Sequence, residues 1–271
     1  MSDALNLPSP LVSAQWLQEH QQRVMVLDVR GAADFERAHI PGARRIAIDQ
    51  DLTGEGVPGS GARRPLPPAA DFAAAMGRVG VGNESVVIVV DDARGVRAAR
   101  LWWMLESLGV SCGVLDGGVT SWRSEVEAGK NTPAQSESFV SRPWPKSHFI
   151  EINEVAELRG QALVLDARSA ARFYGGHSSL DPRPGHIPGA LSAPWTENLS
   201  DEDGRILPLP ELRNRYESLG FQTNSRVVLY CGSGVTACHN ALVLQLLGGR
   251  PRVYVGSWSE WASDAARPVQ L

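Results

Sequence analysis

The same series of short motifs occurs twice along this chain. Residues 26–30 (Val-Leu-Asp-Val-Arg) return as residues 164–168 (Val-Leu-Asp-Ala-Arg), and the pentapeptide His-Ile-Pro-Gly-Ala stands at residues 39–43 and again at 186–190. Two units of roughly 120 residues are too few and too long for a solenoid, in which many short repeats stack in a row. The repetition therefore predicts two duplicated domains.

Each half alternates short β-branched runs with helical patterns. In the first half, an apolar run at 86–90 precedes a helical pattern at 98–108, and another apolar run follows. This alternation predicts an α/β fold in which each domain has a mainly parallel sheet with helices on both faces. We place the N-terminal domain at 8–129 and the C-terminal domain at 148–271, joined by a proline-containing linker at 130–147.

The composition narrows the classes of partner. The formal charge is −4, from 26 basic and 30 acidic residues, which argues against nucleic acid or an anionic membrane as the main partner. No apolar run approaches the roughly 20 residues needed to span a bilayer, and we expect no signal peptide in residues 1–10. Cys112, Cys231 and Cys238 match no disulfide or zinc spacing, so we expect a cytoplasmic protein without a metal or organic cofactor.

Cys231 stands between a strand-like run and an amphipathic stretch. The run at 226–230 reads Arg-Val-Val-Leu-Tyr, the loop at 231–237 reads Cys-Gly-Ser-Gly-Val-Thr-Ala, and a helical pattern follows. Backbone N–H groups converge at a helix start and the helix dipole is positive there, so both favour a thiolate over a thiol. In an open α/β sheet, ligands bind beyond the carboxyl ends of the strands. These features predict an enzyme built around one nucleophilic cysteine.

The two halves differ at the position of this cysteine. The first half has Asp91 where the second has Cys231, and an aspartate cannot act as a sulfur nucleophile. We therefore expect the first domain to be catalytically silent. By contrast, an Asp-x-Arg sequence occurs in both halves, at 28–30 and 166–168, which favours an ion pair within each domain at the strand end.

Two arginines of the second half have no counterpart in the first. Arg172 stands where the first half has Asp34, and Arg183 lies in a segment from Phe173 to His186 that is longer than its counterpart. Two guanidiniums near a thiolate would bind an anionic substrate, ideally a carboxylate held in a bidentate fork. We therefore expect both arginines to bind the substrate.

With these residues in view, the chain resembles the two-domain rhodanese-type sulfurtransferases. The likeness rests on the tandem repeat, the two His-Ile-Pro-Gly-Ala segments and the Cys231 loop, and it covers nearly the whole chain. The loop is similar to the form associated with 3-mercaptopyruvate sulfurtransferase. The resemblance implies a ping-pong reaction, in which the Cys231 thiolate takes a sulfur atom from a donor. The resulting persulfide would pass it to a small thiol, a thioredoxin-like protein or cyanide.

The resemblance also implies roles for individual residues. Loop amides would cradle the anionic persulfide, Ser233 would share a proton relay with His39, and the two arginines would hold the donor carboxylate. Because its pentapeptide occurs in both halves, His39 has a structural turn as its alternative role. The expected catalytic residues are Cys231, Ser233 and His39, and the expected substrate-binding residues are Arg172, Arg183, Gly232, Gly234, Val235 and Thr236.

The loop also bears on the sulfur donor. Thiosulfate-preferring members that resemble this chain have basic residues after the cysteine, which suit a compact dianion, whereas this chain has Gly232 and Ser233. These small neutral positions leave room for a carbon-bearing donor, so we expect 3-mercaptopyruvate in preference to thiosulfate. The alternatives are a thiosulfate:cyanide sulfurtransferase and a non-turnover sulfur carrier or docking protein. A cysteine phosphatase is disfavoured because Ala237 stands where its arginine would be.

Two further positions bear on the site. The family commonly has Asp-Gly-Ser-Trp near the C-terminus, but this chain has Val255 in place of the aspartate, which could weaken a turn or helix cap beside the loop. Cys238 follows Cys231 by about two helical turns and is either a core side chain or a resolving thiol.

Overall fold

The structure, a computed structural model, describes residues 5–130 and 135–271. Of the linker expected at 130–147, residues 131–134 therefore lie outside the described residues. The helices are short: α5 and α9 have 12 residues each. Within the described ranges, no helix reaches the combination of length and apolar content that a bilayer crossing requires.

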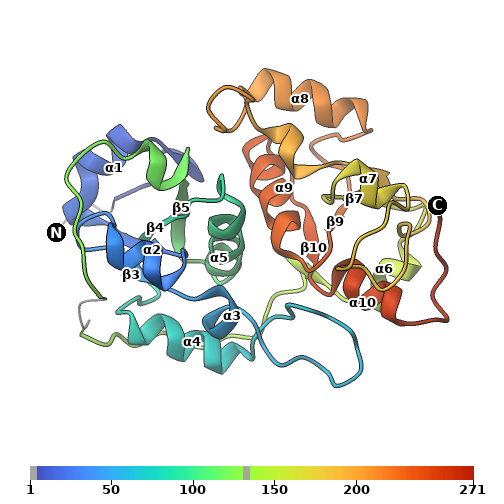
Figure 1. The fold of residues 1–271 in the computed structure, drawn as a ribbon, viewed down its shortest axis with the longest axis horizontal. Coiled ribbons are helices and arrows are strands. Elements are labelled where there is room, and N and C mark those ends of the chain that lie inside the picture. The colour runs from blue at the N-terminus through green and yellow to red at the C-terminus, as the bar shows by residue number, and fades with distance from the viewer. Residues whose placement is uncertain (1–4, 131–134) are drawn as a thin grey trace. The chain divides into compact units, whose positions relative to one another are not determined.

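The chain divides into two compact units, each with its own sheet (Figure 1). Unit 1 contains Met1–Thr53 and Pro67–Trp144, and unit 2 contains Gly54–Leu66 and Pro145–Leu271. The segment Gly54–Leu66 was expected within the N-terminal domain, but its contacts assign it to unit 2. This assignment matters below, because the segment contributes a side chain to the candidate site.

Unit 1 contains a parallel sheet with strand order β1-β5-β4-β2-β3. The β-branched run predicted at 86–90 forms β4 in the centre of this sheet, where all but its first residue is buried. A strand buried on both faces is a continuous apolar run, which explains why the sequence does not alternate here. The elements of unit 1 are β1 (Leu11–Val12), α1 (Ala14–His20), η1 (Gln21–Arg23), β2 (Met25–Asp28), α2 (Ala32–Arg37), β3 (Arg44–Arg45), α3 (Ile48–Asp51), α4 (Ala69–Arg78), β4 (Val86–Val90), α5 (Val96–Ser107), β5 (Ser111–Leu115) and η2 (Gly118–Ser121).

Unit 2 repeats this topology with strand order β6-β10-β9-β7-β8. The registers agree as well, since Asp28 pairs with Val90 in one sheet and Asp166 pairs with Tyr230 in the other. The expected α/β fold, with a mainly parallel sheet in each half, is confirmed. The elements of unit 2 are β6 (Phe149–Ile150), α6 (Ile152–Glu157), β7 (Leu163–Asp166), α7 (Ala170–Phe173), β8 (Leu191–Ser192), η3 (Trp195–Asn198), α8 (Leu209–Ser218), β9 (Val227–Tyr230), α9 (Val235–Leu246), β10 (Arg252–Tyr254) and α10 (Ser257–Ser263).

In each unit a buried ion pair lies at the carboxyl end of the strand next to the central one, β2 in unit 1 and β7 in unit 2. In unit 1, Arg30 Nε lies 2.9 Å from Asp28 Oδ2, and Arg30 Nη2 lies 2.6 Å from the same oxygen. In unit 2, Arg168 makes the same two bonds to Asp166, at 2.9 and 2.6 Å. Both carboxylates are fully buried. The ion pair predicted from the repeated Asp-x-Arg sequence is confirmed in both units.

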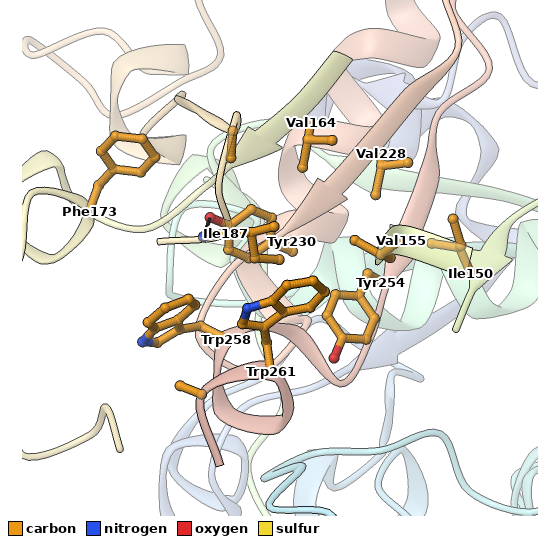
Figure 2. Packing of buried hydrophobic residues seen from close by; sticks show 12 residues of the cluster. Ile150, Val155, Val164, Phe173, Ile187, Val228, Tyr230, Tyr254, Trp258 and Trp261 are labelled. Carbon is orange, nitrogen blue, oxygen red and sulfur yellow. Dashed lines mark hydrogen bonds between the residues drawn. The ribbon is translucent and has the colours of Figure 1, made fainter. Parts of the chain in front are cut away.

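The core of unit 2 anchors the last helix, α10. Its two tryptophans, Trp258 and Trp261, are fully buried against the strand side chains (Figure 2). Their indole N–H groups donate to the carbonyl oxygens of Arg183 at 3.0 Å and Pro268 at 2.9 Å. A tryptophan ring buries a large apolar area, and its N–H group usually has a hydrogen-bond partner when the ring is buried. The start of α10 is thereby held at the carboxyl end of the sheet, where β9 also ends.

Candidate active site

Cys231 follows directly on β9, with only 2% of its surface exposed. The chain turns at Gly234, which has φ +78° and forms the N-cap of α9. The Gly234 N–H group donates to Cys231 Sγ at 3.1 Å, so the sulfur lies at the N-terminus of the helix. A Cβ on Gly234 would lie 2.7 Å from the carbonyl oxygen of Val255, so both the left-handed φ and the close approach require glycine. This position favours negative charge on the sulfur.

The first residues of α10 hold the loop from the other side. The Cys231 N–H group donates to Ser257 Oγ at 3.1 Å, and that hydroxyl donates to the carbonyl of Tyr254 at 2.8 Å. The N–H groups of Trp258 and Ser259 donate to the carbonyls of Cys231 and Gly232, at 2.9 and 3.1 Å. These bonds fix the backbone on which the nucleophile stands.

Ser257 was not predicted from the sequence, although the repeat contained a signal for it. Ser257 has φ +56°, a left-handed conformation that is uncommon for a residue other than glycine. Its counterpart in the first half is Gly118, with φ +57°. Ser257 thus has a strained backbone conformation at a position where the first half has glycine, and its hydroxyl accepts the hydrogen bond from the Cys231 N–H group.

The equivalent loop of unit 1 is occupied by a carboxylate. Asp91 is fully buried, and its Oδ1 accepts hydrogen bonds from the N–H groups of Ala93 at 3.0 Å and Gly95 at 2.9 Å. Its Oδ2 accepts from Arg97 at 2.8 Å and Ala98 at 3.0 Å. Two backbone amides of the loop and two of the first turn of α5 thus bind the two oxygens of one anion.

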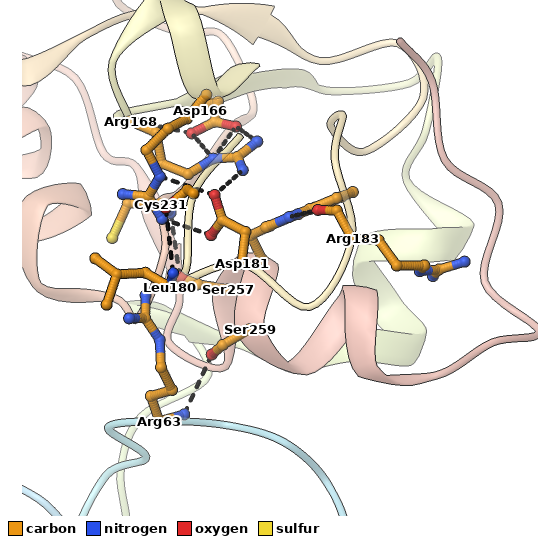
Figure 3. Close-up of polar contacts among 12 residues, drawn as sticks. Arg63, Asp166, Arg168, Leu180, Asp181, Arg183, Cys231, Ser257 and Ser259 are labelled. Atoms are coloured by element: carbon orange, nitrogen blue, oxygen red, sulfur yellow. Dashed lines mark hydrogen bonds and ion pairs between the residues drawn. The ribbon is translucent and has the colours of Figure 1, made fainter. Parts of the chain in front are cut away.

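Arg172 lies beside the Cys231 loop, and its guanidinium binds the carboxylate of Asp181. Arg172 Nε and Nη2 donate to Asp181 Oδ2 at 2.8 Å and Oδ1 at 2.5 Å. Arg168 Nη1 also donates to Asp181, at 3.3 Å (Figure 3). Burial by itself lowers the pKa of the Arg168 guanidinium, but the charge and hydrogen bonds of Asp166, together with the charges of Tyr230 and Asp181, outweigh it, so that pKa is raised. Asp181 was not singled out in the sequence, because an aspartate in a polar insertion is most often solvated.

Arg183 does not lie with Arg172. Its guanidinium donates to the carbonyl oxygens of Ala262 at 2.9 Å, Asp264 at 2.9 Å and Arg267 at 3.2 Å. Figure 3 shows its side chain directed away from Cys231. A helix ends with carbonyl groups that lack partners within the helix, and a cation suits that end. The expected pair of donor-binding arginines is therefore not assembled from Arg172 and Arg183, because Arg183 caps the end of α10.

A different arginine approaches the loop. Arg63, in the segment Gly54–Leu66, donates its backbone N–H to Ser259 Oγ at 3.2 Å (Figure 3). A Cβ on Gly232 would lie 2.5 Å from Arg63 Nη2 and 2.8 Å from Arg172 Nη2, so both guanidiniums meet above this glycine. Desolvation and the charge of Arg172 lower the pKa of the Arg63 guanidinium, and the charges of Asp181 and Cys231 oppose them. The only sequence signal was a pair of arginines in a Gly- and Pro-rich segment.

The sequence of this chain matches one known protein family. A rhodanese-like domain matches it twice, over residues 13–125 and 151–264. The chain belongs to the rhodanese family. The resemblance stated from the two pentapeptides and the Cys231 loop is thereby confirmed.

Three relatives show how far the similarity of this rhodanese extends. A Pseudomonas aeruginosa protein named "Probable 3-mercaptopyruvate sulfurtransferase" is 39% identical, over 96% of this chain and 97% of its own length. A Mycobacterium tuberculosis H37Rv protein, whose name assigns it provisionally to thiosulfate sulfurtransferase, is 34% identical over 91% of this chain and 90% of its own length. The solved 3-mercaptopyruvate sulfurtransferase from Leishmania major is 33% identical, with a TM-score of 0.83, and the match covers 97% of this chain and 77% of that one. The expected enzyme class, a sulfurtransferase, is confirmed.

Two expected catalytic residues of this rhodanese occupy contrasting positions. Ser233 is buried in the Cys231 loop, and within the described residues its hydroxyl has no hydrogen-bond partner. His39 belongs to unit 1, where its Nδ1 lies 2.8 Å from the carbonyl oxygen of Phe35 and its ring stacks on Phe35 at 3.9 Å. His186 repeats both contacts with Phe173 in unit 2, at 3.0 and 3.7 Å. The shared geometry supports the structural turn, and the proton relay stays a prediction.

The remaining loop positions form the start of α9. Val235 and Thr236 are its first two residues, so their backbone N–H groups face the N-terminal end, where Cys231 Sγ lies. Cys238 is fully buried and donates through Sγ to the Gly234 carbonyl at 3.2 Å. This contact supports a core side chain and leaves Cys238 out of reach of solvent. Val255, which replaces the family's aspartate, packs its backbone against Gly234.

The strained serine of this rhodanese can be tested with two substitutions. Ser257→Ala is expected to lower the free energy of unfolding by about 1–3 kcal/mol, because the buried Cys231 N–H loses its acceptor while the left-handed strain remains. Ser257→Gly loses the same acceptor but relieves the strain, so its loss should be about 1 kcal/mol smaller. Urea unfolding of both variants checks this order. Equal stabilities would show that the left-handed φ carries no cost here.

Proposed function

We propose that this rhodanese transfers a sulfur atom from 3-mercaptopyruvate to a thiol or cyanide through a persulfide on Cys231. The observation that carries the proposal is the pair of equivalent loops. In unit 1 four amides bind the carboxylate of Asp91, and in unit 2 the same strand end and helix start carry Cys231. A persulfide, like a carboxylate, is an anion with two adjacent acceptor atoms.

The loops correspond at their helix starts, although the loop of unit 1 is one residue longer. Gly95 and Gly234 are both left-handed N-caps, and each donates its N–H group to the residue that ends the strand. Cys231 Sγ therefore corresponds to the first oxygen of Asp91. The outer sulfur of a persulfide would then correspond to the second oxygen, which in unit 1 accepts from the first turn of the helix. In unit 2 that turn begins with Val235 and Thr236.

The first half-reaction moves one sulfur atom and balances without a cofactor. The thiolate of Cys231 attacks the thiol sulfur of the donor, an S–S bond forms, and the C–S bond of the donor breaks. The electron pair leaves on the carbon next to the keto group as an enolate, which takes up one proton to give pyruvate. The donor thiol gives up one proton as the anionic persulfide forms, so the half-reaction has no net change in protons. A general acid is needed at that carbon, and the buried hydroxyl of Ser233 is the proposed source, with His39 as the proposed relay.

The second half-reaction restores the enzyme. An acceptor attacks the outer sulfur of the persulfide, the S–S bond breaks, and the electron pair returns to Cys231 as a thiolate. With cyanide the product is thiocyanate, and with a thiol it is the acceptor's own persulfide.

None of the three cysteines, all within the described residues, forms a disulfide. This supports the further proposal that the protein works in the cytoplasm, where thiols stay reduced.

Thiosulfate is the competing donor. The guanidiniums that lie at Gly232 favour this dianion more than the loop sequence suggested. The neutral side chains of Gly232 and Ser233 predicted a neutral loop. The guanidiniums of Arg63 and Arg172 nevertheless lie at that glycine, so the chain brings cations to the loop from elsewhere. The loop side chains are neutral, but the site around the loop therefore contains positively charged groups. The preference for 3-mercaptopyruvate has to rest on the balance of all charges around the sulfur.

Steady-state sulfur transfer to cyanide, with both donors compared on one preparation, tests the proposal. We expect kcat/KM for 3-mercaptopyruvate to exceed that for thiosulfate by about tenfold or more, which corresponds to about 1.4 kcal/mol of differential transition-state binding. A preference for thiosulfate would retain the persulfide chemistry and refute the donor. Activity with neither donor would refute turnover and favour a sulfur carrier that discharges only to a protein partner.

A further inference from the structure

The charges around Cys231 in unit 2 are paired, with one exception. Arg168 is paired with Asp166, and Arg172 is paired with Asp181. The guanidinium of Arg63 has no hydrogen-bond acceptor and no carboxylate partner among the residues that the structure describes. Of these three arginines, only Arg63 therefore lacks an ion-pair partner, and it comes from the first half of the sequence. The charge of Cys231 acts on this guanidinium.

Backbone bonds hold the segment from which the exposed side chain of Arg63 extends. Its N–H group bonds to Ser259 on α10, and Gly61 packs so closely on Ser263 that a Cβ there would collide with that side chain. Within the segment, the Gly54 N–H group donates to the Pro65 carbonyl at 3.1 Å, which closes the segment on itself. Arg63 thus reaches the loop from a tethered backbone.

We propose that Arg63 is the residue that binds the anionic group of the donor and sets the enzyme's preference for a donor with a single negative charge. This inference rests on the proposed function and deepens it. Arg172 remains a second contact, with Gly232 between the two guanidiniums. Arg63 takes the place expected for Arg183, whose guanidinium is engaged at the end of α10.

The pairing of Arg172 explains why it cannot bind the donor alone. Its Nε–Nη2 edge, the fork that best grips a carboxylate, is occupied by Asp181. A donor carboxylate can therefore reach only the outward side of Arg172 while Asp181 stays in place. The fork of Arg63 is open. Because Gly232 has no side chain, the Nη2 atoms of both arginines can lie where a Cβ would stand.

The charge balance also predicts which donors the site accepts. Arg63 offers one guanidinium without an ion-pair partner, which suits a single carboxylate such as that of 3-mercaptopyruvate, whereas thiosulfate carries two negative charges. Asp181→Asn would free a second cation without changing the shape of the side chain. This substitution should therefore move the ratio of kcat/KM values towards thiosulfate by about tenfold, because Coulomb interactions at a few ångströms in a partly buried site are of that size.

The binding role can be tested without any turnover. Iodoacetate and iodoacetamide alkylate the same sulfur, but only iodoacetate carries a carboxylate, so the ratio of their rates at Cys231 reports anion binding and cancels the thiolate fraction. We expect Arg63→Ala to lower this ratio by about tenfold, and Arg63→Lys to retain most of it. Arg64→Ala, which removes a charge from the next residue, is the matched control and should leave the ratio near that of the wild type. Cys231→Ser serves as the blank for alkylation elsewhere.

Steady-state kinetics on the same variants complete the test. Arg63→Ala should raise the KM for 3-mercaptopyruvate about tenfold, with the KM for cyanide unchanged. If Arg63→Ala and Arg64→Ala give the same alkylation ratios and the same donor KM, the inference is overturned. If the wild-type protein turns over neither donor, the proposed function fails. The alkylation ratio then supports or refutes Arg63 as the anion-binding residue by itself.

Discussion

Replacing Cys231 with serine is expected to lower kcat for sulfur transfer by at least about 10³-fold with either donor, the scale seen when a nucleophile is removed. A serine hydroxyl is not ionised near neutral pH and cannot form a persulfide. Its oxygen can still accept the hydrogen bond from the Gly234 N–H group that Cys231 Sγ accepts at 3.1 Å. The free energy of unfolding should therefore change by less than about 1 kcal/mol. Steady-state cyanolysis and urea unfolding measure the two quantities.

Cys238→Ser is the matched control for this substitution. Cys238 donates to the Gly234 carbonyl from a fully buried position, and a serine hydroxyl can make the same bond. Sulfur transfer should continue in this variant within a few-fold of the wild-type rate. Residual transfer by Cys231→Ser that disappears in the double variant would identify Cys238 as a second sulfur-carrying thiol and contradict its assignment to the core.

Asp166→Ala should destabilise the protein by about 3–5 kcal/mol, because it leaves the buried guanidinium of Arg168 without the carboxylate that neutralises it. It should also reduce sulfur transfer in the molecules that remain folded. Arg168 shares Asp181 with Arg172, so a displaced Arg168 disturbs the charge balance beside Cys231. Denaturant unfolding, with hydrogen exchange to assign the loss to a unit, and the kcat/KM for 3-mercaptopyruvate measure these effects.

Asp28→Ala in unit 1 is the control that the duplication provides. Asp28 binds Arg30 with the same atoms and nearly the same distances as Asp166 binds Arg168. Its loss should cost a similar free energy of unfolding, whereas the kcat/KM of the folded protein should stay close to that of the wild type. If both variants impair catalysis equally after correction for folded protein, the ion pair of unit 2 has no special link to the site.

Unit 1 serves as an internal reference for unit 2. Both units end their central strand in a loop that closes at a left-handed glycine, Gly95 or Gly234. In unit 1 the anion is built into the chain as Asp91. In unit 2 the anion is formed during the proposed reaction and discharged again. The duplication thus retained an anion-binding loop in both halves and a nucleophile in one.

The sequence alone predicted the features that depend on local or periodic patterns. The repeated motifs indicated two α/β domains, because sheet strands and flanking helices have distinct periods of burial. The Asp-x-Arg sequences indicated buried ion pairs, since two residues on one strand end lie within reach of each other. The position of Cys231 between a strand and a helix likewise followed from its neighbours along the chain.

Only the tertiary structure decided which charged side chains meet at the sulfur. Arg63 and Ser259 are bonded although they are far apart in the sequence, and no local pattern marks such a contact. An arginine has a long side chain that finds whichever acceptors the fold brings near: three carbonyl groups for Arg183, and Asp181 for Arg172. The position of Cys231 could be predicted from the sequence because it depends on neighbouring residues, whereas the charges around it depend on how distant segments pack.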